Sequence, residues 1–179
     1  MIHDQLQELL YQALETELGG IEVYKTAICC AVNGDLKKEW EESLAQTRSH
    51  EEVLQTLMSG LELDPGTETP GRAVVRHIGE SLVEAMELAL ESDTPSAAQR
   101  VATECVVLAE TKDHQNWELI GEYATNATGS LKIALETAYD EVEDDEDEHL
   151  YRSIDWSREL WIESLGLPAI LPPPDEEQR

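Results

Sequence analysis

Apolar residues recur at intervals of three and four along most of this sequence, and that helical period limits the folds open to the chain. The spacing predicts helices over about 2–32, 36–59, 72–92, 96–123 and 131–165. The sequence shows neither the alternation typical of strands nor an internal repeat that would indicate a solenoid. It therefore predicts an all-α fold.

Turn-forming residues separate these helices. "NGD" at 33–35 ends the first helix and caps the second, and the Pro- and Gly-rich "LDPGTETPG" follows the second. In "DTPS", Asp93 or Thr94 can cap the next helix and Pro95 suits its first turn. We expect one domain over 1–166, a four-helix bundle with an additional helix between the second and third bundle helices. The Pro-rich acidic tail, 167–179, cannot be regular helix.

The charge balance narrows the choice of partners. The chain has 39 acidic residues against 12 Lys and Arg, a net charge of -27, while 41% of its residues are hydrophobic. We expect a folded acidic protein that binds neither nucleic acid nor a membrane, because both kinds of binding rely on basic or long apolar segments. The three cysteines, in no metal-binding or disulfide pattern, are expected to be buried thiols in a cytoplasmic protein: Cys29, Cys30 and Cys105.

Polar residues interrupt the apolar rows of four predicted helices. Glu17 lies in the row of the first helix, seven residues before Tyr24. Near the row of the second helix stands His50. An unpaired buried charge is costly, so each of these groups needs a partner.

Further interruptions occur in the two helices that follow the additional one. Asp113 lies in the row of the fourth segment, with Glu110 one turn earlier and His114 beside it. In the last helix, Glu146 and His149 are three residues apart, a spacing that lets a carboxylate and an imidazole reach one metal ion.

That last pair lies within "YDEVEDDEDEHLY", which has eight acidic residues between 140 and 148. Helical apolar spacing enters this stretch at Val142 and leaves it at Leu150, so we expect a helix with most of its acids in solvent. A register shifted along the run would give the metal-binding role to Glu143 instead of Glu146, and to Asp147 instead of His149.

Four short motifs carry a family resemblance: the Glu17 to Tyr24 spacing, "TRSH", "KDHQNW" and "EDEH". Over roughly residues 5–160 the chain resembles the ferritin-like superfamily. Within it, "SLAQTRSHEEVLQTLM" and "ETKDHQNWELIGEYA" are most similar to bacterial ferritin-like stress proteins of the YciF type.

The resemblance implies an antiparallel four-helix bundle, a homodimer or other small homo-oligomer, with two Fe or Mn ions at mid-bundle for redox chemistry with dioxygen or peroxide. The ligands that it implies are Glu17, His50, Asp113, Glu146 and His149, with Tyr24, Glu110 and His114 around them.

The chain departs from the family pattern at two places. Gln46 and Thr47 stand where a carboxylate is expected before His50, and the third-helix ligand is the shorter Asp113 rather than a glutamate. The alternative is a metal-free bundle that acts as a structural or protein-interaction module, its inward polar groups satisfying one another.

Overall fold

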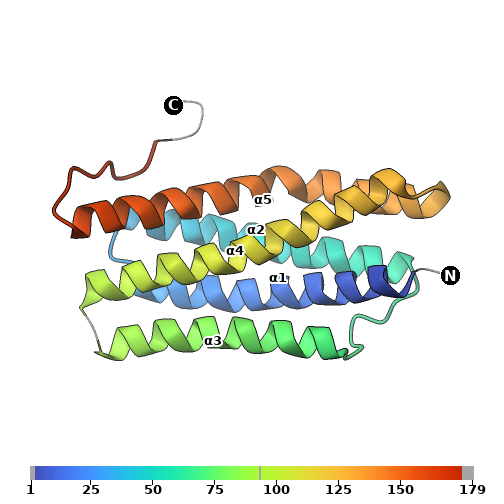
Figure 1. Cartoon of the computed structure of the whole chain (residues 1–179), viewed down its shortest axis with the longest axis horizontal. Coiled ribbons are helices and arrows are strands. Elements are labelled where there is room, and N and C mark those ends of the chain that lie inside the picture. Colours follow the sequence, from blue (N-terminus) through green and yellow to red (C-terminus); the bar gives the residue numbers. More distant parts are fainter. Residues whose placement is uncertain (1–2, 93, 175–179) are drawn as a thin grey trace.

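The computed structural model describes residues 3–92 and 94–174 of the chain. Within them lie five α-helices and no strand, so the all-α prediction is confirmed (Figure 1). Their bounds are α1 Asp4–Cys30, α2 Gly34–Gly60, α3 Pro70–Ser92, α4 Pro95–Asn126 and α5 Gly129–Ser164. No helix in this part of the chain is long and apolar enough to cross a membrane.

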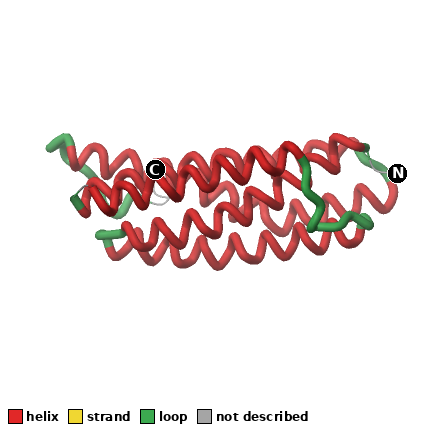
Figure 2. Tube along the Cα trace, turned by 90° about the horizontal axis from the view of Figure 1, so that it is seen from below, coloured by secondary structure: helices red, strands yellow, loops and turns green. Residues whose placement is uncertain are grey.

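Four of the helices, α1, α2, α4 and α5, form a bundle. Contacts join α1 to α2 and α4, and α5 to α4 and α2. Following the colours in Figure 1, α2 and α4 run in one direction and α1 and α5 in the other, so every contacting pair in the bundle is antiparallel. The chain returns between α2 and α4 through α3, which packs on the outside of α1 and α4. Figure 2 shows the loops gathered at the two ends of this long bundle.

Local signals set the helix boundaries. The Asn33 side chain accepts hydrogen bonds from the backbone nitrogens of Asp35 and Leu36 at the start of α2. Thr94 caps α4 in the same way, with Pro95 in the first turn, as predicted. Asp93, the other predicted cap, lies outside the described residues.

A salt-bridge group fixes α3 to α1. The buried Glu15 carboxylate accepts hydrogen bonds from Arg72 at 2.5 Å and Arg76 at 2.7 Å. The Arg72 guanidinium also donates to the carbonyls of Pro65 and Thr67, which holds the loop before α3 against the bundle. These charge-assisted bonds satisfy a guanidinium that would otherwise be buried without partners.

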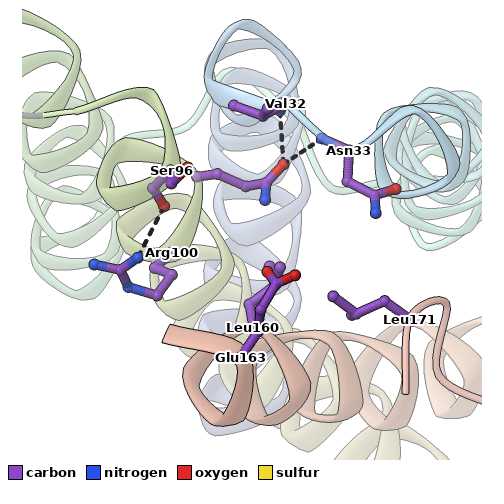
Figure 3. Close-up of a pocket in the computed structure, with 8 residues that line it drawn as sticks. Val32, Asn33, Ser96, Arg100, Leu160, Glu163 and Leu171 are labelled. Atoms are coloured by element: carbon purple, nitrogen blue, oxygen red, sulfur yellow. Dashed lines mark hydrogen bonds between the residues drawn. The ribbon is translucent and has the colours of Figure 1, made fainter. Parts of the chain in front are cut away.

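The residues after α5 fold back along the bundle and do not continue the helix, as predicted for the part of the tail that the structure describes. Arg152 donates to the Pro173 carbonyl, and the backbone nitrogen of Ile170 donates to Glu159. At this end a cavity of about 220 Å³ is lined from α4, α5, the α1–α2 turn and the tail, where Leu171 lies (Figure 3).

Cys30 and Cys105 are buried as expected, but the prediction for Cys29 was wrong, because its side chain lies on an exposed face of α1.

The apolar core consists of two clusters that occupy opposite halves of the bundle. One includes Leu10 and Leu14 of α1, and the other includes Val23 and Ala27 of the same helix. Each of the other three bundle helices likewise contributes to both clusters and passes through a middle layer between them. The polar residues that interrupt the apolar rows of the four helices come together in this layer.

Candidate metal centre

Six buried polar side chains from all four bundle helices meet in the middle layer. We call them the polar cluster: Glu17 of α1, His50 of α2, Glu110 and Asp113 of α4, and Glu146 and His149 of α5. All are at most 4% exposed, and Glu17 is fully buried. In α4 and α5 the paired residues are three positions apart, so one turn of helix presents both to the same interior.

Both imidazoles turn Nδ1 toward the carboxylates. The Nδ1 atom of His50 lies 2.9 Å from Oε1 of Glu146 and 3.9 Å from Oε1 of Glu17. Nδ1 of His149 lies 3.6 Å from Oε2 of Glu110 and 3.8 Å from the same Glu146 oxygen. The two imidazole ring centroids are 5.7 Å apart. The cluster therefore converges on Glu146.

Many of these inward atoms lack a hydrogen-bond partner. Among the described residues, buried atoms without one include Oε2 of Glu17, Nδ1 of both histidines, Oε2 of Glu110, Oδ1 of Asp113 and both carboxylate oxygens of Glu146. The 2.9 Å contact between Nδ1 of His50 and Oε1 of Glu146 is short, but it does not have the geometry of a hydrogen bond. No lysine or arginine in the described ranges forms an ion pair with any member of the polar cluster. Buried polar atoms are normally hydrogen-bonded, so this concentration of free acceptors needs another explanation.

Burial also changes the ionisation of the polar cluster. Loss of solvation, reinforced by neighbouring carboxylates, raises the pKa of Glu17, Asp113 and Glu146 well above the usual values. Burial raises the pKa of Glu110 to about 7. Burial and the nearby His50 lower the pKa of His149 to about 3, so its imidazole is neutral at pH 7. Without a cation, the native protein thus favours protonated carboxyls and a neutral His149.

The ligand atoms fall into two groups that share a residue. His50, Glu146 and His149 each offer one atom, and these atoms all lie within 4.8 Å of one another. Glu17, Asp113 and Glu146 form a second such group. Buried carboxylates and neutral imidazoles are ligands of iron, manganese and zinc, so the residues present fit a metal centre, with Glu146 common to both halves.

The surrounding residues hold the polar cluster in place. The indole nitrogen of Trp117 donates to Oε1 of Glu17 at 2.8 Å. Tyr24 is buried and meets the His149 ring edge-on, with centroids 6.1 Å apart. Burial and the adjacent charge of Glu110 raise the pKa of Tyr24 well above its usual value. The centre is therefore closed by aromatic rings on two sides.

The structure brings the five predicted ligands together and places Glu110 among them rather than around them, with its carboxylate facing His149. His114 differs from the prediction. It turns away from the polar cluster toward the surface, where its ring nitrogens lie 3.6 Å from Glu118 and 3.3 Å from Asp147. The next residue of a helix points about 100° away, which explains why Asp113 faces inward and His114 does not.

Two residues that the sequence did not single out as partners contact the imidazoles from outside. Asp145 lies 3.3 Å from His50, and Gln46 lies 3.0 Å from His149. They belong to different helices, so no local spacing could have paired them. A cavity of about 370 Å³ between α2 and α5 is lined by Gln46 and His149 and gives the outer side of the centre a route to solvent.

Comparisons with protein-family models, with curated proteins and with solved structures found no match. The function is therefore inferred from the geometry of the polar cluster.

Proposed function

We propose that this protein is a ferritin-like bundle protein that holds two iron or manganese ions in the polar cluster and uses them for redox chemistry with dioxygen or peroxide. The observation that carries the proposal is the convergence of buried carboxylate and imidazole groups, many of whose inward atoms lack a hydrogen-bond partner. None of these groups forms an ion pair with a lysine or arginine of the described residues. Retaining so many unpaired buried groups destabilises a bundle unless a cation joins them.

The path of the chain supports the ferritin-like assignment. Ferritin-like bundles have one long connection within a four-helix arrangement, with inward Glu residues and Glu-x-x-His pairs. Here α3 and its flanking loops form a long connection between α2 and α4, and Glu146 with His149 forms one such pair.

Five members of the polar cluster would hold the metal ions in this proposal. Glu146 belongs to both ligand groups, so it would help to hold metal in both halves of the centre. His50 and His149 would serve one half of the centre, and Glu17 and Asp113 the other. Iron or manganese, when bound, supplies the electrons that reduce dioxygen or peroxide. The buried aromatic residues exclude bulk water, and Trp117 orients Glu17.

The proposal is tested by oxidation of Fe(II). Protein loaded with Fe(II) without oxygen is mixed with dioxygen or with peroxide, and the rates of iron oxidation and oxidant consumption are measured. Wild-type protein should oxidise iron much faster than buffer does, and Glu146→Gln should lose most of that acceleration. Glu141→Gln, exposed on the same helix, should behave as wild type. A wild-type rate equal to that of buffer would favour the metal-free structural module.

A further inference from the structure

The outer sides of the two cluster imidazoles are joined by a pair of residues that we call the outer bridge, Gln46 of α2 and Asp145 of α5. Nε2 of His50 lies 3.3 Å from Oδ2 of Asp145, and Nε2 of His149 lies 3.0 Å from Oε1 of Gln46. The Gln46 amide nitrogen donates to Oδ1 of Asp145 at 2.8 Å. One continuous chain of hydrogen bonds therefore connects His50 to His149 across the gap between α2 and α5.

The chemistry of the outer bridge sets the direction of every hydrogen bond in it. A carboxylate oxygen only accepts, so the Gln46 atom that faces Asp145 must be the NH₂ group. The Gln46 oxygen then faces His149, and it too can only accept, which requires the proton on Nε2 of His149. By the same reasoning, Asp145 requires the proton on Nε2 of His50.

At a pH where both rings are neutral, each imidazole carries a single N–H, so both rings then present an unprotonated Nδ1 to the polar cluster. These are the two Nδ1 atoms that lack hydrogen-bond partners. An unprotonated ring nitrogen is what a metal ion binds, and the hydrogen bond on the other nitrogen decides which one is free.

We propose that Gln46 and Asp145 are positioning residues that fix both histidines as the Nε2–H tautomer and so aim two Nδ1 lone pairs at one metal subsite. The inference rests on the proposed metal-binding function, but the tautomers belong to the metal-free protein. It also gives a reason for an amide at position 46. A carboxylate there would still accept from His149, but it would repel Asp145 instead of donating to it.

The tautomers can be observed directly in ¹⁵N-labelled, metal-free protein by long-range ¹H–¹⁵N correlation NMR at pH 8. In wild type, both His50 and His149 should be in the Nε2–H form. Gln46→Met removes the acceptor for His149, whose ring should become a mixture of tautomers while His50 keeps its proton through Asp145. Gln46→Glu retains an acceptor, so His149 should stay Nε2–H. Gln55→Met, exposed on the same helix, should change neither ring.

A parallel Fe(II) or Mn(II) titration measures the consequence for binding. Loss of such an outer partner typically weakens metal affinity about 10- to 100-fold, so Gln46→Met should show a weakening of that size and Gln55→Met none. An Nδ1–H tautomer at either wild-type ring, or an unchanged His149 in Gln46→Met, would overturn the positioning role. If both wild-type rings are in the Nε2–H form but the protein binds no metal, the positioning role of the outer bridge is supported and the proposed function is refuted.

Discussion

At the scale of single residues, the buried carboxyl groups of the polar cluster lower the stability of the metal-free protein as pH rises. Glu110 shows the effect most simply, since burial raises its pKa to about 7 from the usual value of 4.5. The unfolded chain loses this proton near pH 4.5 and the native protein only near pH 7. The native state is therefore increasingly penalised across that interval, and the penalty is complete above it.

Glu110→Gln removes the ionisation and keeps the shape. We expect the metal-free variant to lose less unfolding free energy than wild type between pH 5 and pH 8, by up to about 3 kcal/mol at pH 8, because 1 pKa unit corresponds to 1.36 kcal/mol. Urea unfolding at both pH values measures the difference. Glu122→Gln, exposed on the same helix, is the matched control. Equal pH dependence in Glu110→Gln and wild type would show that Glu110 ionises in the native protein as it does in the unfolded chain.

Residues that interrupt an apolar row were predictable, and residues that meet them from a neighbouring helix were not. Glu17 and Glu146 stand where the helical period requires an apolar side chain, and both are buried. The shifted register left Asp147 open as a ligand, but its side chain is 63% exposed and pairs with His114. The contact between Gln46 and Asp145 depends on how α2 and α5 face each other, which no local pattern encodes.

At the scale of elements, α4 and α5 pack closely enough at one point to require a glycine. A Cβ atom added at Gly121 would lie 2.7 Å from the Tyr139 ring, closer than real Cβ contacts allow. Overpacking costs about 1–3 kcal/mol, whereas replacing a mid-helix glycine by alanine gains about 1 kcal/mol. We therefore expect Gly121→Ala to destabilise the protein slightly, with the ring displaced.

Removing the ring should reverse the sign of that effect. In a Tyr139→Ala background, Gly121→Ala should stabilise the protein by about 1 kcal/mol, because only the helix-propensity gain remains. Thermal or urea unfolding of the four proteins in this cycle gives both values. A destabilising Gly121→Ala in the Tyr139→Ala background would contradict the packing explanation.

The helix boundaries predicted from apolar spacing and turn residues agree with the structure to within a few positions, because caps such as Asn33 and Thr94 act locally. The position of α3 against the bundle could not be predicted from such local signals. Its attachment to α1 depends on Glu15 reaching Arg72 and Arg76, residues more than fifty positions away in sequence. Sequence predicted this helix and its order in the chain, whereas its place in the fold depends on long-range contacts such as these ion pairs and the burial of Met86 in the core.

For the molecule as a whole, the net charge of -27 means that acidic side chains repel one another across the surface. Much of the acidic run of α5 is exposed, including Asp140, Asp144 and Glu148. Like charges on a helix surface destabilise it, and salt shortens their range from about 10 Å at 0.1 M to about 3 Å at 1 M. We expect the melting temperature of the metal-free protein to rise with KCl concentration over this range.

A variant with Asp140→Asn, Asp144→Asn and Glu148→Gln should melt higher than wild type in low salt and gain less from KCl. Circular dichroism melts of both proteins in 0.05 M and 1 M KCl make the comparison. Equal salt gains in the two proteins would show that repulsion within this run has no effect on stability.

Whether the polar cluster binds metal can be decided by counting the ions that the protein retains. Protein purified without chelator, equilibrated anaerobically with Fe(II) or Mn(II) and freed of excess metal, is analysed for metal per chain. We predict about two ions in wild type and in Glu141→Gln, and at most one in Glu146→Gln, which lacks the carboxylate shared by both ligand groups. Wild-type protein that retains no metal, or no more than Glu146→Gln does, would show that the polar cluster is not a metal centre.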